Sequence, residues 1–360
     1  MATEPGVPGE STAIGNTWED LYSMYNGKKV LDIHGHVSAP TATRAFVSML
    51  MASNTAMKSP LSDGRPNPEM SDEEFMKSCG RHADFMSERN IDVQVIGPRP
   101  FIMLGWMADH LLPAWTRFVN DTIHKQCTLF PDRFIAAAQL PQNSDAPDLS
   151  HCLPELNRCV DELGFKAVYL APDPKGKRTT PGMHEHYWDP IYAECEKRGL
   201  PIIVHGTNCQ DPRIGIIPQN YQIGFVWEQY LASQLLAHGD VFDRFPGLKV
   251  VVCHGGGALN RFIPTDPHLG QKDYTKNLFY DTCVHDIPVL EATIKQRGVK
   301  NTLFGTEAPG SGAAVRPETG KTADDMVPVI DALGFLSQGD KDDIFHNNPL
   351  GFLPAFKEKL

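Results

Sequence analysis

Four histidines and one glutamate each stand at or just after the end of an apolar run. His34 and His36 follow "KKVLDI", and the other three occur in "PIIVH", "VVVCH" and "NTLFGTE", as His205, His254 and Glu307. Residues i and i+2 of an extended segment point to the same side, so the first two histidines are spaced to bind one ion. Three histidines with a carboxylate suit Zn²⁺ or a similar cation, which activates water near neutral pH.

Each of these residues also has a structural explanation when it is taken alone. The first pair fits two polar side chains in a loop, His205 a hydrogen-bonded core residue, and Glu307 the acid of a helix N-terminus. The glycines that follow His254 in "CHGGGALNRF" allow close backbone approach and favour a site. A second pair, His184 and His186 in "MHEHYWDP", precedes a helical pattern, and we expect it to bind no metal. All five residues at predicted strand ends together are stronger evidence for a metal site than any one of them alone.

Short apolar runs alternate with helix-like segments along the chain. The runs carry no polar alternation, which is typical of strands buried on both faces of a parallel sheet. We predict strands at residues 29–33, 92–97, 134–140, 166–170, 201–205, 248–254, 278–282 and 301–305. Eight strands alternating with helices predict a distorted, TIM-like (β/α)₈ barrel, with a doubly wound open sheet as the alternative. In the barrel, all five residues face the C-terminal mouth, where such folds place their chemistry.

The rest of the sequence is organised around this one barrel. We predict a disordered or loosely attached arm over residues 1–25 and a single barrel domain over 26–360. The polar stretch from about 41 to 70 is rich in Pro, Ser and Met and predicts an insertion after the first strand. The sequence leaves open whether this insertion is a lid, a subunit contact or neither. Ser71, followed by three acids, predicts a helix start.

Composition restricts the partners of this protein. The chain has 360 residues, 41% of them hydrophobic, and a net charge of −11 without basic blocks, which argues against nucleic acid and anionic membranes as partners. Eight cysteines without a CxxC pair indicate free thiols in a reducing compartment. Since no apolar segment approaches a membrane span and the N-terminus lacks signal-peptide features, we expect a cytoplasmic protein.

Several motifs together resemble one enzyme family. "LDIHGH", "PIIVHG", "VVVCHGGG" with a following basic residue, and an acid after the last strand are similar to the amidohydrolase superfamily. The resemblance runs from about residue 29 to 350 and favours the branch of aminocarboxymuconate-semialdehyde decarboxylases and aromatic-acid decarboxylases. Most of the superfamily carries Asp after strand eight, whereas this chain has Glu307 in "GTEAPG". That glutamate, with "GPRPF" and "RPETGKTADD", resembles the 4-oxalomesaconate hydratases, which belong to bacterial catabolism of lignin-derived aromatic acids.

The resemblance implies a metal-dependent hydrolase-type barrel with a single zinc bound by His34, His36, His205 and Glu307. It also implies hydration of a carbon–carbon double bond in an unsaturated oxo-tricarboxylate. Ligand type alone does not separate Zn²⁺ from Mn²⁺. In our hypothesis Glu307 or a neighbour accepts a proton from the metal-activated water, and His254 donates a proton or hydrogen bond to the developing enolate.

A polycarboxylate substrate requires cationic and polar partners. Arg99 follows the second strand and Arg316 lies in the long loop after the eighth, and a guanidinium suits a carboxylate. The loop after His205 carries Asn208 as a further substrate-binding candidate and Tyr221, which resembles an active-site tyrosine of the hydratases. Asp281, at the end of strand seven, would hydrogen-bond a ligand histidine or cap a helix.

Other functions fit part of the same pattern. A decarboxylase of an aromatic or muconate-type acid would use the same metal, as would a hydrolase of an amide, an ester or a ring-cleavage product. A protein that binds but has lost catalysis would be favoured by a missing ligand, and no expected ligand is missing. We therefore expect an enzyme acting on a small-molecule carboxylate, assembled as a homo-oligomer, most simply a dimer.

Overall fold

The computed structural model describes residues 24–38, 71–207, 209–217, 220–266 and 274–360. The predicted arm over 1–25 and the insertion over 41–70 fall almost entirely outside these ranges. In the part of the chain that is described, no helix has the length and apolar character needed to cross a membrane.

Eight parallel strands follow one another in sequence order and form the predicted barrel. The ends of the sheet meet where the Ile33 amide donates to the Phe304 carbonyl and the Glu307 amide to the His34 carbonyl. The strands are β1 (Leu31–His36), β2 (Val93–Gly97), β3 (Phe134–Gln139), β4 (Ala167–Leu170), β5 (Ile202–Val204), β6 (Val250–Val252), β7 (Leu278–Asp281) and β8 (Thr302–Leu303).

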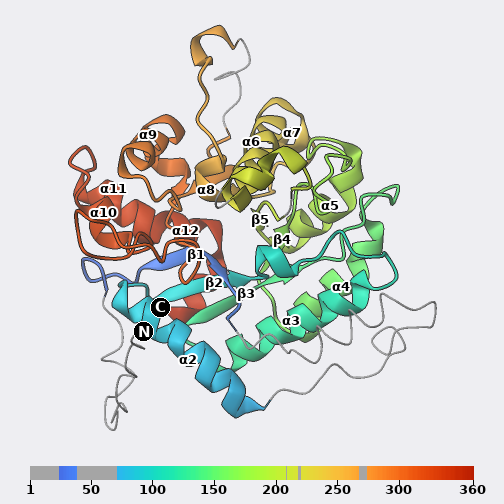
Figure 1. Ribbon diagram of the computed structural model, residues 1–360, viewed down its shortest axis with the longest axis horizontal. Coiled ribbons are helices and arrows are strands. Elements are labelled where there is room, and N and C mark those ends of the chain that lie inside the picture. Colours follow the sequence, from blue (N-terminus) through green and yellow to red (C-terminus); the bar gives the residue numbers. More distant parts are fainter. Residues whose placement is uncertain (1–23, 39–70, 208, 218–219, 267–273) are drawn as a thin grey trace, which may run out of the picture.

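Helices surround these strands, with α2 and α3 on one side of the barrel and α6 and α9 on the other (Figure 1). The α-helices are α2 (Asp72–Glu88), α3 (Leu112–Leu129), α4 (Leu153–Asn157), α5 (Asp189–Arg198), α6 (Asn220–His238), α7 (Val241–Arg244), α8 (Cys253–Gly256), α9 (Ile287–Arg297), α10 (Val327–Asp331), α11 (Gln338–Asp342) and α12 (Asn348–Phe352). Short 3₁₀ or π turns are η2 (Pro100–Ile102), η3 (Ser150–Cys152), η4 (Arg158–Glu162), η5 (His186–Trp188), η6 (Pro212–Ile216), η7 (Ile263–Thr265), η8 (Val299–Asn301), η9 (Asp343–Asn347) and η10 (Pro354–Lys359).

Most predicted strands differ from the observed ones by one or two residues at an end, and two predicted boundaries that concern site residues were wrong. Residues 34 and 36 belong to β1 instead of following it, because His36 still pairs with Gly97 of β2. His254 lies beyond β6, which ends at Val252, because the backbone turns into a left-handed conformation at that histidine. The predicted helix start is confirmed, since Ser71 forms a reciprocal capping box with Glu74 at the N-terminus of α2.

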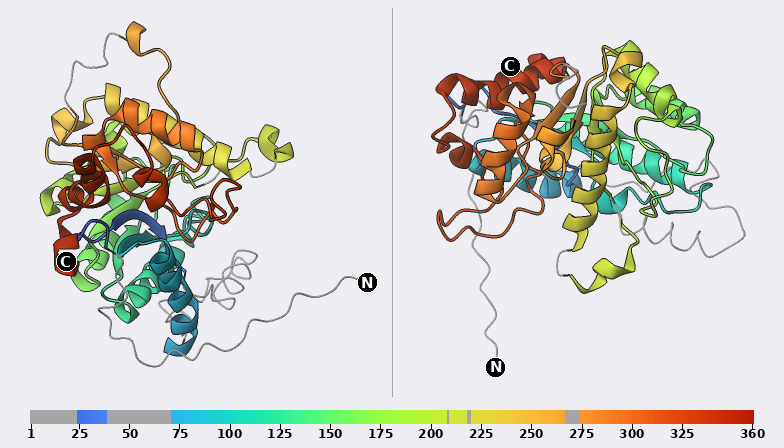
Figure 2. Two further views of the ribbon diagram at one scale, coloured as in Figure 1. Left: turned by 90° about the vertical axis from the view of Figure 1, so that its left-hand side faces the viewer. Right: turned by 90° about the horizontal axis from the view of Figure 1, so that it is seen from above.

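The barrel interior is packed with side chains and is closed at one end. A buried cluster combines inward-facing residues of the strands, such as Ile203 and Val251, with Phe352 and Phe356 from the C-terminal segment. Lys29 and Lys249, which precede strands, donate to carbonyls of that segment. The C-terminal segment therefore covers the N-terminal ends of the strands, and the opposite mouth is left for chemistry. In the left-hand view of Figure 2, η7, drawn in orange, lies at the tip of a segment that extends away from the barrel.

The glycine run after β6 is required by the backbone and by α6. Gly255, Gly256 and Gly257 all have positive φ, and a Cβ on Gly257 would lie 2.3 Å from the Val226 carbonyl oxygen and 2.5 Å from the Tyr230 nitrogen. Only glycine accepts both the left-handed conformation and this close approach. The run thereby sets the distance between β6 and α6.

We predict that Gly257→Ala lowers the free energy of unfolding by about 2–4 kcal/mol, because it adds backbone strain to a steric clash. Chemical denaturation followed by circular dichroism would measure this loss. The matched control is Gly80→Ala in α2, where a Cβ meets nothing within 4 Å and the helix gains propensity. Equal stability of the two variants would contradict the packing argument.

A buried acid on α6 makes stability depend on pH. Glu228 is 5% exposed, and burial, followed by the charge of Asp173, raises the pKa of its carboxyl to about 7. Its pKa in the folded protein is therefore higher than in the unfolded chain, near 4.5, so the folded state binds the proton more tightly. The free energy of unfolding therefore falls as the pH rises from about 4.5 to about 7, and it levels off above about 7.

Glu228→Gln should remove this loss and make the protein more stable than the wild type at pH 8, by about 1–3 kcal/mol, with little difference at pH 5. Thermal or denaturant unfolding at both pH values would measure it. The control Glu162→Gln replaces an exposed glutamate and should change neither value. A Glu228→Gln variant with the pH profile of the wild type would refute the assignment.

Candidate metal centre and substrate pocket

Four histidine rings from three strand ends meet at the C-terminal mouth of the barrel. His34 and His36 lie on β1, His205 directly follows β5, and His254 lies just beyond β6. The centroid of the His205 ring lies 5.0 Å from that of His34, 5.1 Å from that of His36 and 4.9 Å from that of His254. The structure therefore brings together residues that are as much as 220 positions apart in the sequence.

Glu307, in the segment after β8, reaches into this group of rings. One carboxylate oxygen, Oε1, lies 3.2 Å from His36 Nε2 and 3.8 Å from His205 Nε2. The other, Oε2, lies 3.5 Å from His254 Nε2 and accepts a hydrogen bond from the Ser311 hydroxyl at 2.6 Å. His34, His205, His254 and Glu307 each offer one ligand atom, and these four atoms lie within 4.8 Å of one another.

Hydrogen bonds on the outer side of three rings determine which nitrogen faces inward. The Nδ1–H of His34 donates to Asp281 Oδ2 at 2.7 Å, that of His36 to the Pro98 carbonyl at 2.9 Å, and that of His205 to its neighbouring Gly206 carbonyl at 2.5 Å. Carbonyl and carboxylate oxygens only accept, so each Nδ1 carries the proton. Each Nε2 then presents a lone pair to the interior, which is the orientation of a metal ligand.

The donor set fits a divalent cation. Nε2 of His34 and Nε2 of His205 are buried and have no hydrogen-bond partner among the described residues. Nε2 of His36 lies 3.2 Å from Glu307 Oε1, and in the neutral ring with its proton on Nδ1 both of these atoms are acceptors. A buried polar atom without a partner is costly, and acceptors turned toward one another repel. A cation with nitrogen and oxygen ligands would satisfy all of these atoms together.

Burial keeps two of the rings neutral, the form that binds metal. It lowers the pKa of His36 to about 3 and that of His205 to about 4. Burial also lowers the pKa of His34, but the hydrogen bond and charge of Asp281 outweigh it, so the pKa is raised. For Glu307, burial acts to raise the pKa, yet the surrounding histidines lower it well below its usual range and keep the carboxylate ionised.

His254 differs from the other histidines in exposure and in proton placement. Its side chain is 15% exposed, compared with 0–1% for the other three rings. Its Nδ1 lies 2.9 Å from Gln229 Nε2 and 3.1 Å from Gln229 Oε1, so this contact is compatible with a proton on either ring nitrogen. His254 and Glu307 also have positive φ, of 53° and 59°, a strained conformation that is enriched at functional sites.

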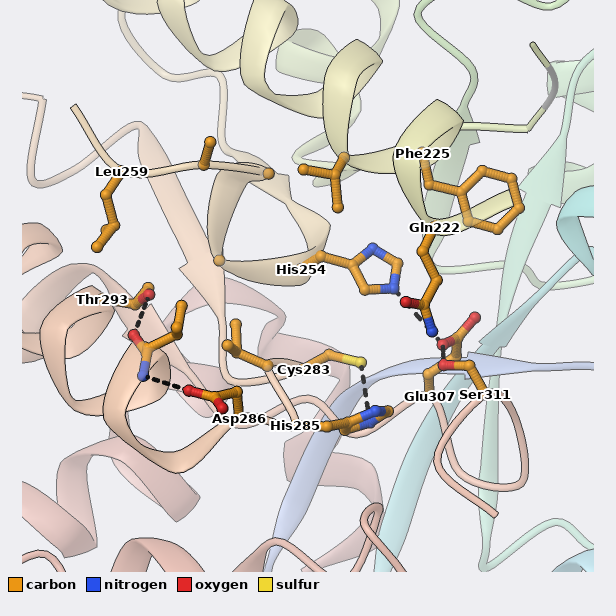
Figure 3. Close-up of a pocket in the computed structure, with 16 residues that line it drawn as sticks. Gln222, Phe225, His254, Leu259, Cys283, His285, Asp286, Thr293, Glu307 and Ser311 are labelled. Carbon is orange, nitrogen blue, oxygen red and sulfur yellow. Dashed lines mark hydrogen bonds and ion pairs between the residues drawn. The ribbon is translucent and has the colours of Figure 1, made fainter. Parts of the chain in front are cut away.

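A cavity of about 310 Å³ opens beside His254 and Glu307 (Figure 3). Its polar side includes His285, from the loop after β7, and Ser311. Its apolar side is contributed by α6 and by the segments that follow β6 and β7, with Phe225, Val226, Leu259, Val284 and Val289. A cavity with an apolar body and a few polar groups is typical of a small-molecule site.

Sequence reasoning missed His285 and Ser311. His285 ends "DTCVH" after β7, so the strand-end rule that found the other histidines also applies to it. Burial, followed by the charge of His254, lowers the pKa of His285. Ser311 had no such pattern, because its contact with Glu307 depends on the local turn of the loop.

One prediction about a hydrogen-bond partner is confirmed. Asp281 accepts the hydrogen bond from His34 described above, and its second oxygen accepts from the Gly255 amide at 3.0 Å. His184 and His186 belong to no potential metal cluster among the described residues. The ring of His186 is exposed and pairs with Asp189 at 2.7 Å.

The predicted substrate-binding residues lie outside the cavity or outside the described residues. Arg99 donates to the Val37 carbonyl at 2.9 Å and to the Ser38 hydroxyl at 3.0 Å, and Arg316 donates to the Ala323 carbonyl at 2.8 Å. Neither arginine is among the described residues that line the cavity. Asn208 and the side chain of Tyr221 are not described, so all four roles stay predictions.

Comparison with known proteins shows the family of this chain. A family profile described as amidohydrolase matches residues 31–355. The chain is 29% identical over 343 residues to the 2-keto-4-carboxy-3-hexenedioate hydratase of Sphingobium sp. (strain SYK-6), covering 92% of this chain and 98% of the relative. It is 25% identical over 287 residues to the 2-amino-3-carboxymuconate-6-semialdehyde decarboxylase of Dictyostelium discoideum, covering 74% of each.

A solved structure is similar to this protein in both fold and sequence. The crystal structure of 4-oxalomesaconate hydratase from Rhodopseudomonas palustris matches with a TM-score of 0.77 and 28% identity, covering 91% of this chain and 97% of that one. The similarity extends along nearly the whole length of both proteins. Since the amidohydrolase profile also spans most of the chain, this protein belongs to the amidohydrolase family.

Proposed function

We propose that the protein is a metal-dependent lyase that adds water to a conjugated carbon–carbon double bond of a small unsaturated polycarboxylate. The observation that carries the proposal is the similarity to two hydratases along more than nine-tenths of this chain. Similarity to the Dictyostelium decarboxylase covers a smaller share, 74%. Such an enzyme would act in the degradation of aromatic compounds. Assembly as a dimer and a cytoplasmic location stay predictions.

His34, His36, His205 and Glu307 would hold the cation in this proposal, Zn²⁺ or Mn²⁺. Their buried, inward-facing lone pairs support the assignment. A divalent cation bound there would supply Lewis acidity, which lowers the pKa of water and polarises an oxygen of the substrate. The group of atoms within ligand distance of one another contains His254 and not His36, but the exposure of His254 toward the cavity favours a role in proton transfer. His36 is kept in the proposed set because its Nε2 lies 3.2 Å from Glu307 Oε1.

The residues at the cavity wall would move the protons of a hydration. Glu307 is ionised and borders the cavity, so it would accept the proton of the attacking water. His254 would donate either the proton that ends on the neighbouring carbon or a hydrogen bond to the developing enolate oxygen. Ser311 donates to Glu307 Oε2 and would hold the carboxylate in its orientation.

A decarboxylase of an aromatic acid is the second candidate. The observation in its favour is the apolar side of the cavity, including Phe225 and Val284, together with a lining whose described residues include no lysine or arginine. A flat ring with one carboxylate would need fewer cationic partners than a tricarboxylate. A hydrolase of the same family is the third possibility, and product analysis separates all three.

Metal content separates the residues that hold the cation from those that react. We predict that His205→Ala and His205→Asn bind far less metal than the wild type, which should hold about one ion per chain. His254→Ala should keep its metal while losing turnover by about 10²–10⁴-fold. Elemental analysis of purified protein would measure the metal, with His186→Ala as the surface control. Full metal content in both His205 variants would contradict the assignment.

The reaction itself is tested by the mass of the product. The metal-loaded protein should convert an unsaturated oxo-tricarboxylate such as 4-oxalomesaconate into a product that is heavier by one water. Glu307→Gln, which cannot accept the proton, should lower this rate by about 10²–10⁴-fold. Release of CO₂ from a dihydroxybenzoate or a carboxymuconate, with no hydration product, would replace the hydratase proposal by the decarboxylase.

A further inference from the structure

A buried histidine outside the candidate metal centre takes part in a continuous chain of hydrogen bonds. His82 lies on α2, is 1% exposed and does not line the cavity. Its Nε2 lies 2.8 Å from Gln94 Oε1 on β2, and its Nδ1 lies 3.1 Å from Gln126 Nε2 on α3. The chemistry proposed above does not use this histidine, so its burial between two amides needs its own explanation.

The direction of every hydrogen bond in this chain is determined. Gln94 Nε2 lies 2.8 Å from Asp32 Oδ2 and 2.9 Å from the Ala308 carbonyl oxygen, which both accept, so the amide group must donate there. Gln94 Oε1 therefore faces His82, whose Nε2 must carry the proton. His82 Nδ1 then accepts from Gln126, and Gln126 Oε1 accepts from the Ser38 amide at 2.9 Å.

The series of hydrogen bonds begins and ends at the two segments that carry the proposed metal ligands. Asp32 and Ser38 flank the two histidines of β1, and Ala308 directly follows Glu307. Asp32 also accepts from the His34 amide at 2.9 Å and from the Thr306 hydroxyl at 2.6 Å. The Gln94 amide group therefore bridges β1 and the segment after β8, and the hydrogen bond that its oxygen accepts from His82 holds it in this orientation.

The space for this bridge exists because residue 35 is glycine. A Cβ on Gly35, between the two histidines, would lie 2.3 Å from Gln94 Cδ and 2.4 Å from Gln94 Oε1. The Gln94 side chain thus passes directly against the backbone of the metal-binding segment. Burial also lowers the pKa of His82 to about 3, in agreement with a neutral ring whose Nδ1 accepts.

We infer that His82 and Gln94 are positioning residues, which hold the His34–His36 segment and the Glu307 segment at the spacing that the cation requires. The inference rests on the proposed metal site and adds to it the groups that set its affinity. Outer hydrogen-bond partners of metal ligands commonly contribute about 10–100-fold in affinity. A purely structural role would lower stability and leave the affinity of the folded protein unchanged.

The test measures Zn²⁺ affinity of the full-length protein by competition with a chelator. Gln94→Glu keeps the size of the side chain but replaces the donor with a carboxylate beside Asp32, and His82→Phe removes both ring contacts. Each should weaken Zn²⁺ binding by about 10–100-fold. His124→Phe on α3, a histidine whose ring contacts the Leu163 carbonyl, is the matched control and should bind as the wild type does.

A second measurement does not depend on the variants folding. Nitrogen NMR of the wild-type protein should show His82 with Nε2 protonated and Nδ1 unprotonated, unchanged from pH 5 to pH 8, which spans the ordinary histidine pKa of about 6.5. A ring that titrates in this range overturns the inference. So do folded variants that bind Zn²⁺ as tightly as the wild type. A wild type that binds no divalent cation would overturn the proposed function as well.

Discussion

The outward hydrogen bonds of three buried histidines are the constraint on which the site depends. Asp281, the Pro98 carbonyl and the Gly206 carbonyl each accept a hydrogen bond from an Nδ1–H, so each ring in its neutral form turns an Nε2 lone pair toward the interior of the site. In a buried place such an arrangement is repulsive without a cation. The barrel provides the framework, because parallel strands that are distant in sequence end at one mouth.

The site divides into a part that would hold the metal and a part that would meet the substrate. The rings of the first part are buried and fixed in one tautomer, whereas His254 is partly exposed and held by a glutamine amide that leaves its proton free to occupy either nitrogen. Glu307 belongs to both parts, since it lies among the rings and also borders the cavity. A glutamate at position 307 could therefore both bind the cation and contact the substrate.

Most of the fold and the gathering of four histidines with Glu307 could be predicted, because apolar strands and histidines at strand ends leave local patterns in the sequence. His285 was missed although it follows the same rule, and Ser311 could not be found because its contact depends on the loop. The bridge through Gln94 and His82 was also beyond sequence reasoning. It joins residues of four elements, and a glutamine within a strand does not indicate which way its amide group is turned.

The close contact between Gly35 and Gln94 has a consequence for how this protein can change over generations. The residue between His34 and His36 would be expected to vary freely, since its own side chain binds nothing. Here the neighbouring strand occupies the volume that a methyl group would need. A larger residue at position 35 can therefore be accepted only in a lineage that has first shortened the side chain at position 94, which makes the order of the two substitutions as important as their identity.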